Sequence, residues 1–213
     1  MSTSVTEQFH ELAAQGREFY QRGWMYGTSG NLSVRLEESP LRIGVTASGV
    51  DKGSLSAEDI VTIERGAEPF PAHLRPSAET SIHEAVYTAL EDVNAVLHVH
   101  TPASTVLSMR VNDGTTLGHL HLQGYEMLKG LGFWDENVTV RIPVFPNHGS
   151  VPQIGDELRE YLEMHPDCPP VFLIWGHGLT AWGSSIAEAR HRLEIGHFLC
   201  ECELSNAPSK ERT

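Results

Sequence analysis

The stretch Ala95-Val96-Leu97-His98-Val99-His100 is a short apolar run that ends in two histidines. Such a run predicts a β-strand, in which side chains two residues apart point to the same face. His98 and His100 are therefore expected side by side, with Leu97 and Val99 on the opposite face. Two imidazoles held in this way provide half of a divalent metal site. The alternative is that they are two histidines of an ordinary strand that bind no metal. Residues elsewhere in the chain have to distinguish these two interpretations.

The elements expected on both sides of this strand include helices and further strands. Apolar residues at helical spacing predict helices, and alternating or continuous apolar runs predict strands. The expected strands cover residues 32–36, 41–47, 60–64, 95–100, 117–122, 138–144, 171–175 and 179–182, and the expected helices cover 5–24, 78–90, 102–109, 125–131, 154–164 and 186–204. Hairpins come first and helix–strand alternation follows, which predicts one α/β domain over residues 1–213 with a mixed, largely antiparallel sheet between two layers of helices. The polar end, residues 205–213, is expected to be a frayed tail.

The formal net charge of −13 argues against nucleic acid or an anionic membrane surface as a partner. No apolar run approaches the roughly 20 residues that a transmembrane helix needs, and the first residues lack the basic and apolar regions of a secretory signal. The three cysteines do not have zinc-finger spacing, so reduced thiols in a cytoplasmic protein are the simplest interpretation. The net negative charge of the protein repels an anionic substrate. Such a substrate therefore needs a local binding site of backbone N–H groups or nearby cationic side chains.

A catalytic zinc usually has three protein ligands and one open position, so the strand histidines need a third partner. His177 is our choice, because it follows the apolar run 171–175 closely and lies between two glycines that permit a sharp turn. The competing candidates are a second His-x-His pair and a histidine before another glycine: His119, His121 and His148. None of them adjoins so apolar a run, and the pattern therefore favours His177.

Two glutamates are candidate acid/base groups beside such a metal. Glu79 opens the helix expected just before the histidine strand, where an acid is common for helix-dipole reasons alone. Glu126 lies in the short helix expected over 125–131, where a solvated glutamate is the ordinary interpretation. A carboxylate beside a divalent cation can act as a general acid/base on a substrate that the metal polarises. His83, four residues after Glu79, shares its helix face and is a simple pairing partner for it.

Two small-residue loops at strand ends are candidate phosphate sites. Residues 27–31, which end in Asn31, and the pair Ser48-Gly49 are rich in glycine, hydroxyl and amide groups. Such loops can turn several N–H groups toward an anion, and Lys52 adds the cation that an acidic protein needs. Neither loop matches a P-loop or dinucleotide fingerprint, and plain turns are the alternative interpretation.

Five short motifs, taken together and in order, resemble the class II aldolase and adducin-like family of zinc-dependent sugar-phosphate enzymes. They are Ser29-Gly30-Asn31-Leu32-Ser33, Thr46-Ala47-Ser48-Gly49, Pro76-Ser77-Ala78-Glu79, His98-Val99-His100 and Gly176-His177-Gly178-Leu179. The resemblance implies an αβα sandwich, one Zn²⁺ per subunit on the three histidines, and a homotetramer with active sites between subunits. It also implies phosphate contacts from Asn31, Ser48, Gly49, Lys52 and Ser77. Ala78 departs from the second serine that is frequent in the family, so a side-chain contact to phosphate is missing there.

Within the family, residues 46–52, 98–104 and 121–130 resemble the dehydratases that act on 5-methylthioribulose 1-phosphate in methionine salvage. Those dehydratases carry their acid/base glutamate in a Glu-Met-(Leu/Ile)-Lys-Gly context, which corresponds to Glu126, whereas the aldolases use a glutamate that corresponds to Glu79. The resemblance therefore implies a lyase that removes water to give 2,3-diketo-5-methylthiopentyl 1-phosphate. In that reaction Glu126 is the expected acid/base and Glu79 is the second candidate.

Three other functions stay open from the sequence. An aldolase or an epimerase uses the same scaffold and acts at a C–C bond or at a stereocentre. A non-catalytic scaffold is a further class, but such relatives tend to lose zinc ligands and this chain keeps all three histidines. A zinc hydrolase is disfavoured, because the sequence has no His-Glu-x-x-His helix and no Gly-x-Ser-x-Gly elbow.

Overall fold

A sheet of eight strands forms the middle layer of the computed structural model, which describes residues 4–64 and 66–206. The strands lie in the order β3-β2-β1-β4-β8-β7-β6-β5. Every neighbouring pair is antiparallel except β6 and β7. The strands are β1 (Asn31–Glu37), β2 (Arg42–Thr46), β3 (Ile60–Glu64), β4 (Ala95–Val99), β5 (Gly118–Leu122), β6 (Val140–Phe145), β7 (Val171–Ile174) and β8 (Leu179–Gly183). The expected mixed, largely antiparallel sheet is confirmed, with strand ends that shift by a residue or two.

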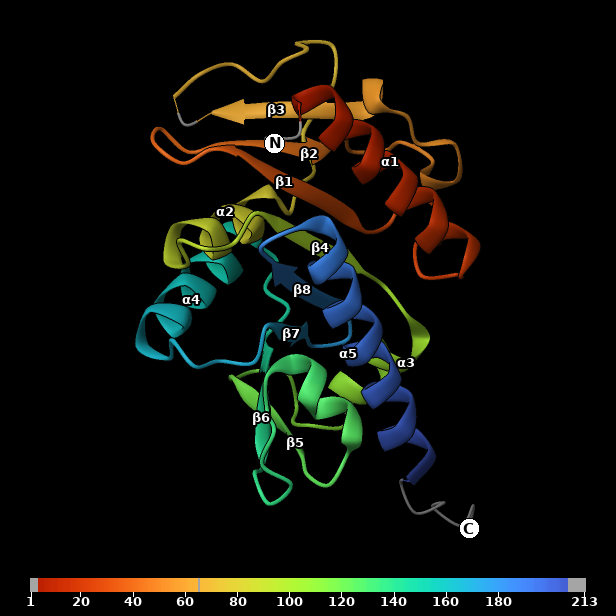
Figure 1. Ribbon diagram of the computed structural model, residues 1–213, viewed down its shortest axis with the longest axis vertical. Coiled ribbons are helices and arrows are strands. Elements are labelled where there is room, and N and C mark those ends of the chain that lie inside the picture. Colours follow the sequence, from red (N-terminus) through yellow and green to blue (C-terminus); the bar gives the residue numbers. More distant parts are fainter. Residues whose placement is uncertain (1–3, 65, 207–213) are drawn as a thin grey trace.

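Helices cover both faces of this sheet, as the layered interpretation requires. Helices α1 (Val5–Gln21), α3 (Pro102–Ser108) and α5 (Ile186–Asn206) lie on one face, and α2 (Thr80–Ala89) and α4 (Val151–Met164) lie on the other (Figure 1). The side chains of β4 alternate between the two cores. Leu97 and Val99 pack with α1, α3 and α5, whereas Val96 packs with α2 and α4. The αβα sandwich is therefore confirmed. Within the described residues, no helix combines the length and the apolar composition needed to cross a membrane.

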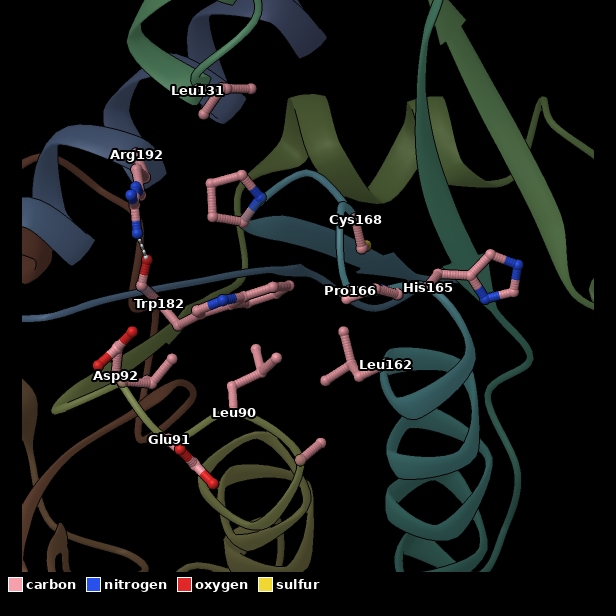
Figure 2. Close-up of a pocket in the computed structure, with 13 residues that line it drawn as sticks. Leu90, Glu91, Asp92, Leu131, Leu162, His165, Pro166, Cys168, Trp182 and Arg192 are labelled. Atoms are coloured by element: carbon pink, nitrogen blue, oxygen red, sulfur yellow. Dashed lines mark hydrogen bonds between the residues drawn. The ribbon is translucent and has the colours of Figure 1, made fainter.

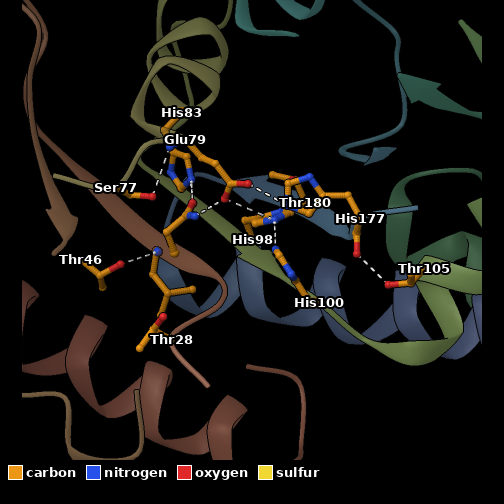
Figure 3. A network of polar contacts seen from close by, with 12 residues as sticks. Thr28, Thr46, Ser77, Glu79, His83, His98, His100, Thr105, His177 and Thr180 are labelled. Carbon is orange, nitrogen blue, oxygen red and sulfur yellow. Dashed lines mark hydrogen bonds and ion pairs between the residues drawn. The ribbon is translucent and has the colours of Figure 1, made fainter. Parts of the chain in front are cut away.

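The start of α2 differs from the expectation. The expected helix starts at residue 78, but α2 begins at Thr80 with Glu79 as its N-cap residue. The Ser77 hydroxyl accepts a hydrogen bond from the Glu79 N–H at 3.3 Å, so Ser77 contacts the backbone of the cap residue. This shift leaves the Glu79 side chain free of any capping role, and it points to the sheet instead (Figure 3).

Two further segments also differ from their expected form. Residues Glu126–Leu131 form a 3₁₀ helix, η3, which ends at Gly132 with a φ of +97°. Helix α5 continues through Asn206, whose amide donates to the Tyr125 hydroxyl at 2.9 Å. The first two residues of the expected tail are thus helical, and the remainder, residues 207–213, lies outside the described residues.

Candidate active site

Three histidines converge where β4 ends and where β7 turns back into β8. His98 lies in β4, His100 follows its end, and His177 lies in the turn between β7 and β8. The turn comes beside the end of β4 because β4 and β8 are paired, with His98 opposite Thr180. The ring centroids of the three histidines are 4.4 to 5.1 Å apart.

The turn that carries His177 depends on its two glycines. Gly176 has a φ of +62°, in the left-handed region that favours glycine. A Cβ atom on Gly178 would lie 2.3 Å from the carbonyl oxygen of Val99, so only glycine fits against the end of β4. From the other side, the Thr105 hydroxyl of α3 donates to the His177 carbonyl oxygen at 2.7 Å. These contacts fix the turn on the end of β4.

Glu79 completes the group from the start of α2 (Figure 3). Its Oε1 lies 2.7 Å from Nε2 of His177, and its Oε2 lies 3.5 Å from Nε2 of His98. The side-chain amide of Asn31 donates to the same carboxylate from β1. The carboxylate and the three imidazoles each offer a ligand atom, and these atoms all lie within 4.8 Å of one another.

Burial sets the charge state of the group. It lowers the pKa of His98 well below its ordinary value, against an opposing effect of Glu79. Burial, followed by the effect of His177, lowers the pKa of His100 to about 4. Burial alone would raise the pKa of Glu79, but His98 together with the hydrogen bonds from His177 and Asn31 outweighs it, and the pKa lies well below its ordinary range. At neutral pH the imidazoles of His98 and His100 are therefore neutral and Glu79 is a carboxylate, which are the forms that bind metal ions.

The donor atoms fit a divalent cation. The Nδ1 of His98 pairs with the Thr180 hydroxyl at 2.8 Å, and with Thr180 as the acceptor the Nε2 lone pair points into the group. Nε2 of His98 and Nε2 of His100 lie 2.9 Å apart. When both rings are neutral, at most one of these two nitrogens can carry a proton toward the other. Nδ1 of His177 is buried without a hydrogen-bond partner in the described part of the chain. Imidazole nitrogens and a carboxylate oxygen are the donor set of catalytic zinc sites.

The predicted phosphate residues come together beside this group through backbone contacts. Lys52 is 1 % exposed, and its ammonium donates to the carbonyl oxygens of Thr28, at 3.2 Å, and Val50, at 3.0 Å. It therefore joins the loop before Asn31 to the loop after Ser48. The Ser48 N–H donates to the Arg75 carbonyl at 2.8 Å, which brings Ser48 and Gly49 beside the segment that contains Ser77.

Two of these residues are committed to internal contacts. The Lys52 ammonium already bonds two carbonyl groups under the loops, and burial lowers its pKa. Asn31 is 3 % exposed, and its amide contacts Glu79 at one end and His83 at the other. Ser48 and Gly49 are exposed, and Ser77 is half-buried. Phosphate binding by this set stays a prediction.

Glu126 lies apart from the histidine group. It opens η3 with a side chain that is 81 % exposed, and its carboxylate pairs with the Lys129 ammonium at 2.8 Å. The competing histidines also lie elsewhere: His119 contacts the Tyr161 hydroxyl at 3.2 Å, and His148 pairs with Glu157 at 2.9 Å. Within the described residues, the ligand group contains Glu79, His98, His100 and His177 and none of these others.

Sequence reasoning missed several residues that shape the site. Thr180 and Thr105 orient two of the histidines, but the β4–β8 pairing that places Thr180 beside His98 cannot be read from spacing. The expected pairing of His83 with Glu79 is wrong as a direct contact, because His83 reaches Glu79 only through Asn31. The four-residue spacing of His83 from Glu79 predicts that the two side chains share a helix face, but it cannot predict that Asn31 lies between them.

A separate cavity of about 450 Å³ lies at the carboxyl end of α2 (Figure 2). Leu90, Leu162 and Trp182 form much of its lining. Its Arg192 guanidinium donates to the Trp182 carbonyl oxygen at 2.9 Å and pairs with Glu188 at 2.8 Å. The cation is thus engaged by the protein, and the cavity lacks the converging donors of the histidine group.

Comparison with known proteins gives a consistent result. Residues 10–204 match the family described as Class II Aldolase and Adducin N-terminal domain. A probable bifunctional methylthioribose-1-phosphate isomerase/methylthioribulose-1-phosphate dehydratase of Nocardia farcinica is 43% identical over 95% of this chain, which spans only 36% of that longer protein. A methylthioribulose-1-phosphate dehydratase of Leptospira biflexa is 40% identical over 90% of this chain and 93% of its own length. Among solved structures, YgbL of Klebsiella pneumoniae superimposes with a TM-score of 0.79 at 22% identity, covering 98% of this chain and 94% of its own, which supports the fold.

Proposed function

Since the chain belongs to the class II aldolase and adducin family, we propose that it is the dehydratase of that family: a lyase that converts 5-methylthioribulose 1-phosphate to 2,3-diketo-5-methylthiopentyl 1-phosphate and water. The proposal depends above all on the relatives of that name, which match this chain over nine tenths of its length. The convergence of Glu79 with His98, His100 and His177 supports it with a site suited to a sugar phosphate.

Zinc is the proposed metal, one ion per subunit on His98, His100 and His177. When bound, it supplies Lewis acidity that stabilises negative charge on the oxygens of the ketose. Three imidazole nitrogens match the ligand preference of zinc, and Glu79 is close enough to act as a further ligand or as a hydrogen-bond partner. Metal analysis of protein purified without chelators tests this part separately.

The side chains divide the remaining work. The loops at Asn31, at Ser48 and Gly49, and at Ser77 hold the phosphate, while Lys52 keeps two of these loops in place. A fixed phosphate sets which carbon meets the base. A carboxylate then removes the C3 proton, and the C4 hydroxyl leaves with a proton as water. The resulting C3–C4 enol tautomerises to the 2,3-diketone, so one water is lost and no redox partner is needed.

Glu126 is the proposed acid/base for these proton transfers. Its exposed position on η3 separates it from the histidine group of its own chain, so we propose that it serves the site of a neighbouring subunit in a homotetramer. Helix α5 holds η3 in place, since the Tyr125 hydroxyl donates to Glu203 at 2.6 Å. A cytoplasmic location is part of the proposal and is supported by the three cysteines, which are all free.

A class II aldolase or epimerase is the second candidate, and one observation favours it. Glu79, the residue that corresponds to the aldolase base, lies within the histidine group, whereas Glu126 does not. The dehydratase, aldolase and epimerase reactions would all use the same metal and phosphate sites, so an assay with defined substrates has to distinguish them.

A substrate panel tests the proposal. The metal-loaded enzyme is given 5-methylthioribulose 1-phosphate and, in parallel, fuculose, rhamnulose and ribulose phosphates. We expect the diketone from the first substrate and no aldehyde or epimer from the others. Retro-aldol cleavage or epimerisation without diketone formation would replace the dehydratase by the second candidate.

A further inference from the structure

A row of buried polar side chains leads away from Glu79 between β1 and α2, and Figure 3 shows its first part, from Glu79 to His83. Asn31 joins Glu79 to Nε2 of His83, Nδ1 of His83 lies 2.6 Å from the Ser33 hydroxyl, and that hydroxyl lies 2.8 Å from the Tyr87 hydroxyl. None of these four residues is more than 3 % exposed. A buried polar group is tolerated when it has a hydrogen-bond partner. Removing one side chain of the row therefore leaves a buried neighbour without its partner.

The direction of every hydrogen bond in the row follows from its end at Glu79. Asn31 donates through Nδ2 to the carboxylate, so its Oδ1 faces His83. An amide oxygen only accepts, and therefore His83 carries its proton on Nε2 and accepts at Nδ1 from Ser33. Because the Ser33 hydroxyl proton points to His83, Ser33 in turn accepts from Tyr87. All the donors point toward Glu79.

We propose that His83 is a positioning residue for the reaction: by donating to Oδ1 of Asn31 it fixes the Asn31 amide and, through it, the Glu79 carboxylate against His98 and His177. This inference rests on the proposed function and assigns a role to a residue outside the metal and phosphate sets. Ser33 lies two residues after Asn31 on β1, and His83 lies one helical turn after Glu79 on α2. Asn31 and Ser33 therefore lie on one face of β1, and Glu79 and His83 lie on one face of α2, so the two pairs of side chains can contact each other.

Loss of the His83 donor frees the Asn31 amide to rotate, and Glu79 then loses its fixed contact from β1. A misplacement of about 1 Å within an active site, even one caused by a residue away from the reacting atoms, lowers turnover by about 100-fold. We therefore expect His83→Leu to lower kcat by about 10- to 100-fold with a smaller change in KM. His83→Gln keeps a donor toward Asn31 and an acceptor toward Ser33, and we expect it to restore kcat to within about fivefold of the wild type.

A double-mutant cycle separates positioning from a general effect on folding. In an Asn31→Ala background the proposed link is already broken, so adding His83→Leu should change kcat by less than about twofold. The melting temperature, by contrast, should fall in both backgrounds. If His83→Leu lowers kcat equally with and without Asn31, His83 does not act through Asn31 and the proposal is overturned.

Tyr87→Phe gives a second test if His83→Leu does not fold, because the ring volume is kept and only the far donor is lost. We expect a fall in kcat of about two- to fivefold that also disappears in the Asn31→Ala background. The matched control is Tyr161→Phe, which removes a hydroxyl from another largely buried tyrosine outside the row. Equal effects of the two tyrosine variants would overturn the proposal.

The tautomer of His83 is measurable without turnover. In ¹⁵N-histidine-labelled protein the proposal requires the proton on Nε2, and a proton on Nδ1 would overturn it. If the wild type fails on the proposed substrate while the tautomer is as expected, the proposed function fails and the hydrogen-bond row stands. If the wild type is active and the cycle is additive, only the role of His83 fails.

Discussion

Replacement of Gly178 by alanine tests how tightly the His177 turn is fixed to β4. The added Cβ would lie 2.3 Å from the Val99 carbonyl oxygen, 2.9 Å from the His98 ring and 3.1 Å from the His100 ring. Since Cβ contacts under 3.0 Å essentially never occur, the turn has to move by at least about 0.7 Å. The nearest atom belongs to the backbone of a central strand, so the turn is the part that moves.

The expected cost follows from this overpacking. Inserting a methyl group into a packed site costs about 1–3 kcal/mol, which lowers the melting temperature of a chain of this size by about 2–12 °C. Displacement of His177 should also weaken metal binding by about 10- to 100-fold, the range seen when the support of a ligand is removed.

The assay combines a thermal melt with metal titration of chelator-treated protein. Gly149→Ala is the matched control, because it also follows a histidine and no atom lies within 4 Å of its added Cβ. It should match the wild type in both measurements. A Gly178→Ala protein with full metal affinity and an unchanged melting temperature would refute the argument that the turn is held rigidly.

Three further predictions concern the metal, the acid/base and pH. His98→Ala or His177→Ala should remove both metal binding and turnover, measured by metal content and diketone formation; a variant that keeps a full equivalent of metal contradicts the ligand assignment. Glu126→Gln should keep the metal and lose turnover by about 100-fold or more, and full activity in that variant removes Glu126 from the mechanism. Burial lowers the pKa of His83 to about 4, while the unfolded chain binds the proton near its ordinary value of 6.5, so the metal-free protein should lose stability as the pH falls from about 6.5 to 4. Denaturant titrations across this window should show a shallower slope for His83→Gln, and equal slopes would mean that His83 is not buried in its neutral form.

Much of the fold was predictable because its elements are short and strongly patterned. The alternation around Leu97 and Val99 and the continuous run Val171–Ile174 each predict a strand without ambiguity, and both strands are present. The order of strands in the sheet was not predictable. Helix periodicity and strand alternation report local geometry, whereas the β4–β8 pairing joins residues about eighty positions apart.

The same limit applies to the site. The glycines around His177 indicated a turn that brings a histidine close to the backbone, and the structure places it beside His98 and His100. Lys52 shows what composition leaves out: a lysine beside a phosphate loop suggests a cation for the ligand, and the structure adds that its buried ammonium donates to two carbonyl groups under the loops. Its role toward phosphate stays a prediction. Glu126 could be proposed only from its motif context, because the fold of the described residues does not bring it to the histidine group of the same chain.

The pairing of β4 with β8 divides the chain into two halves of four strands each, since β3, β2, β1 and β4 lie on one side of it and β8, β7, β6 and β5 on the other. Glu79, His98 and His100 come from the first half, and His177 comes from the second. The free energy of metal binding is therefore coupled to the joining of the two halves. A bound ion would link the two halves directly, whereas the chain itself joins them through the connection from α3 to β5. A chain cut in that connection should reassemble more tightly with the metal than without it, and the metal would then be part of the architecture as well as of the chemistry.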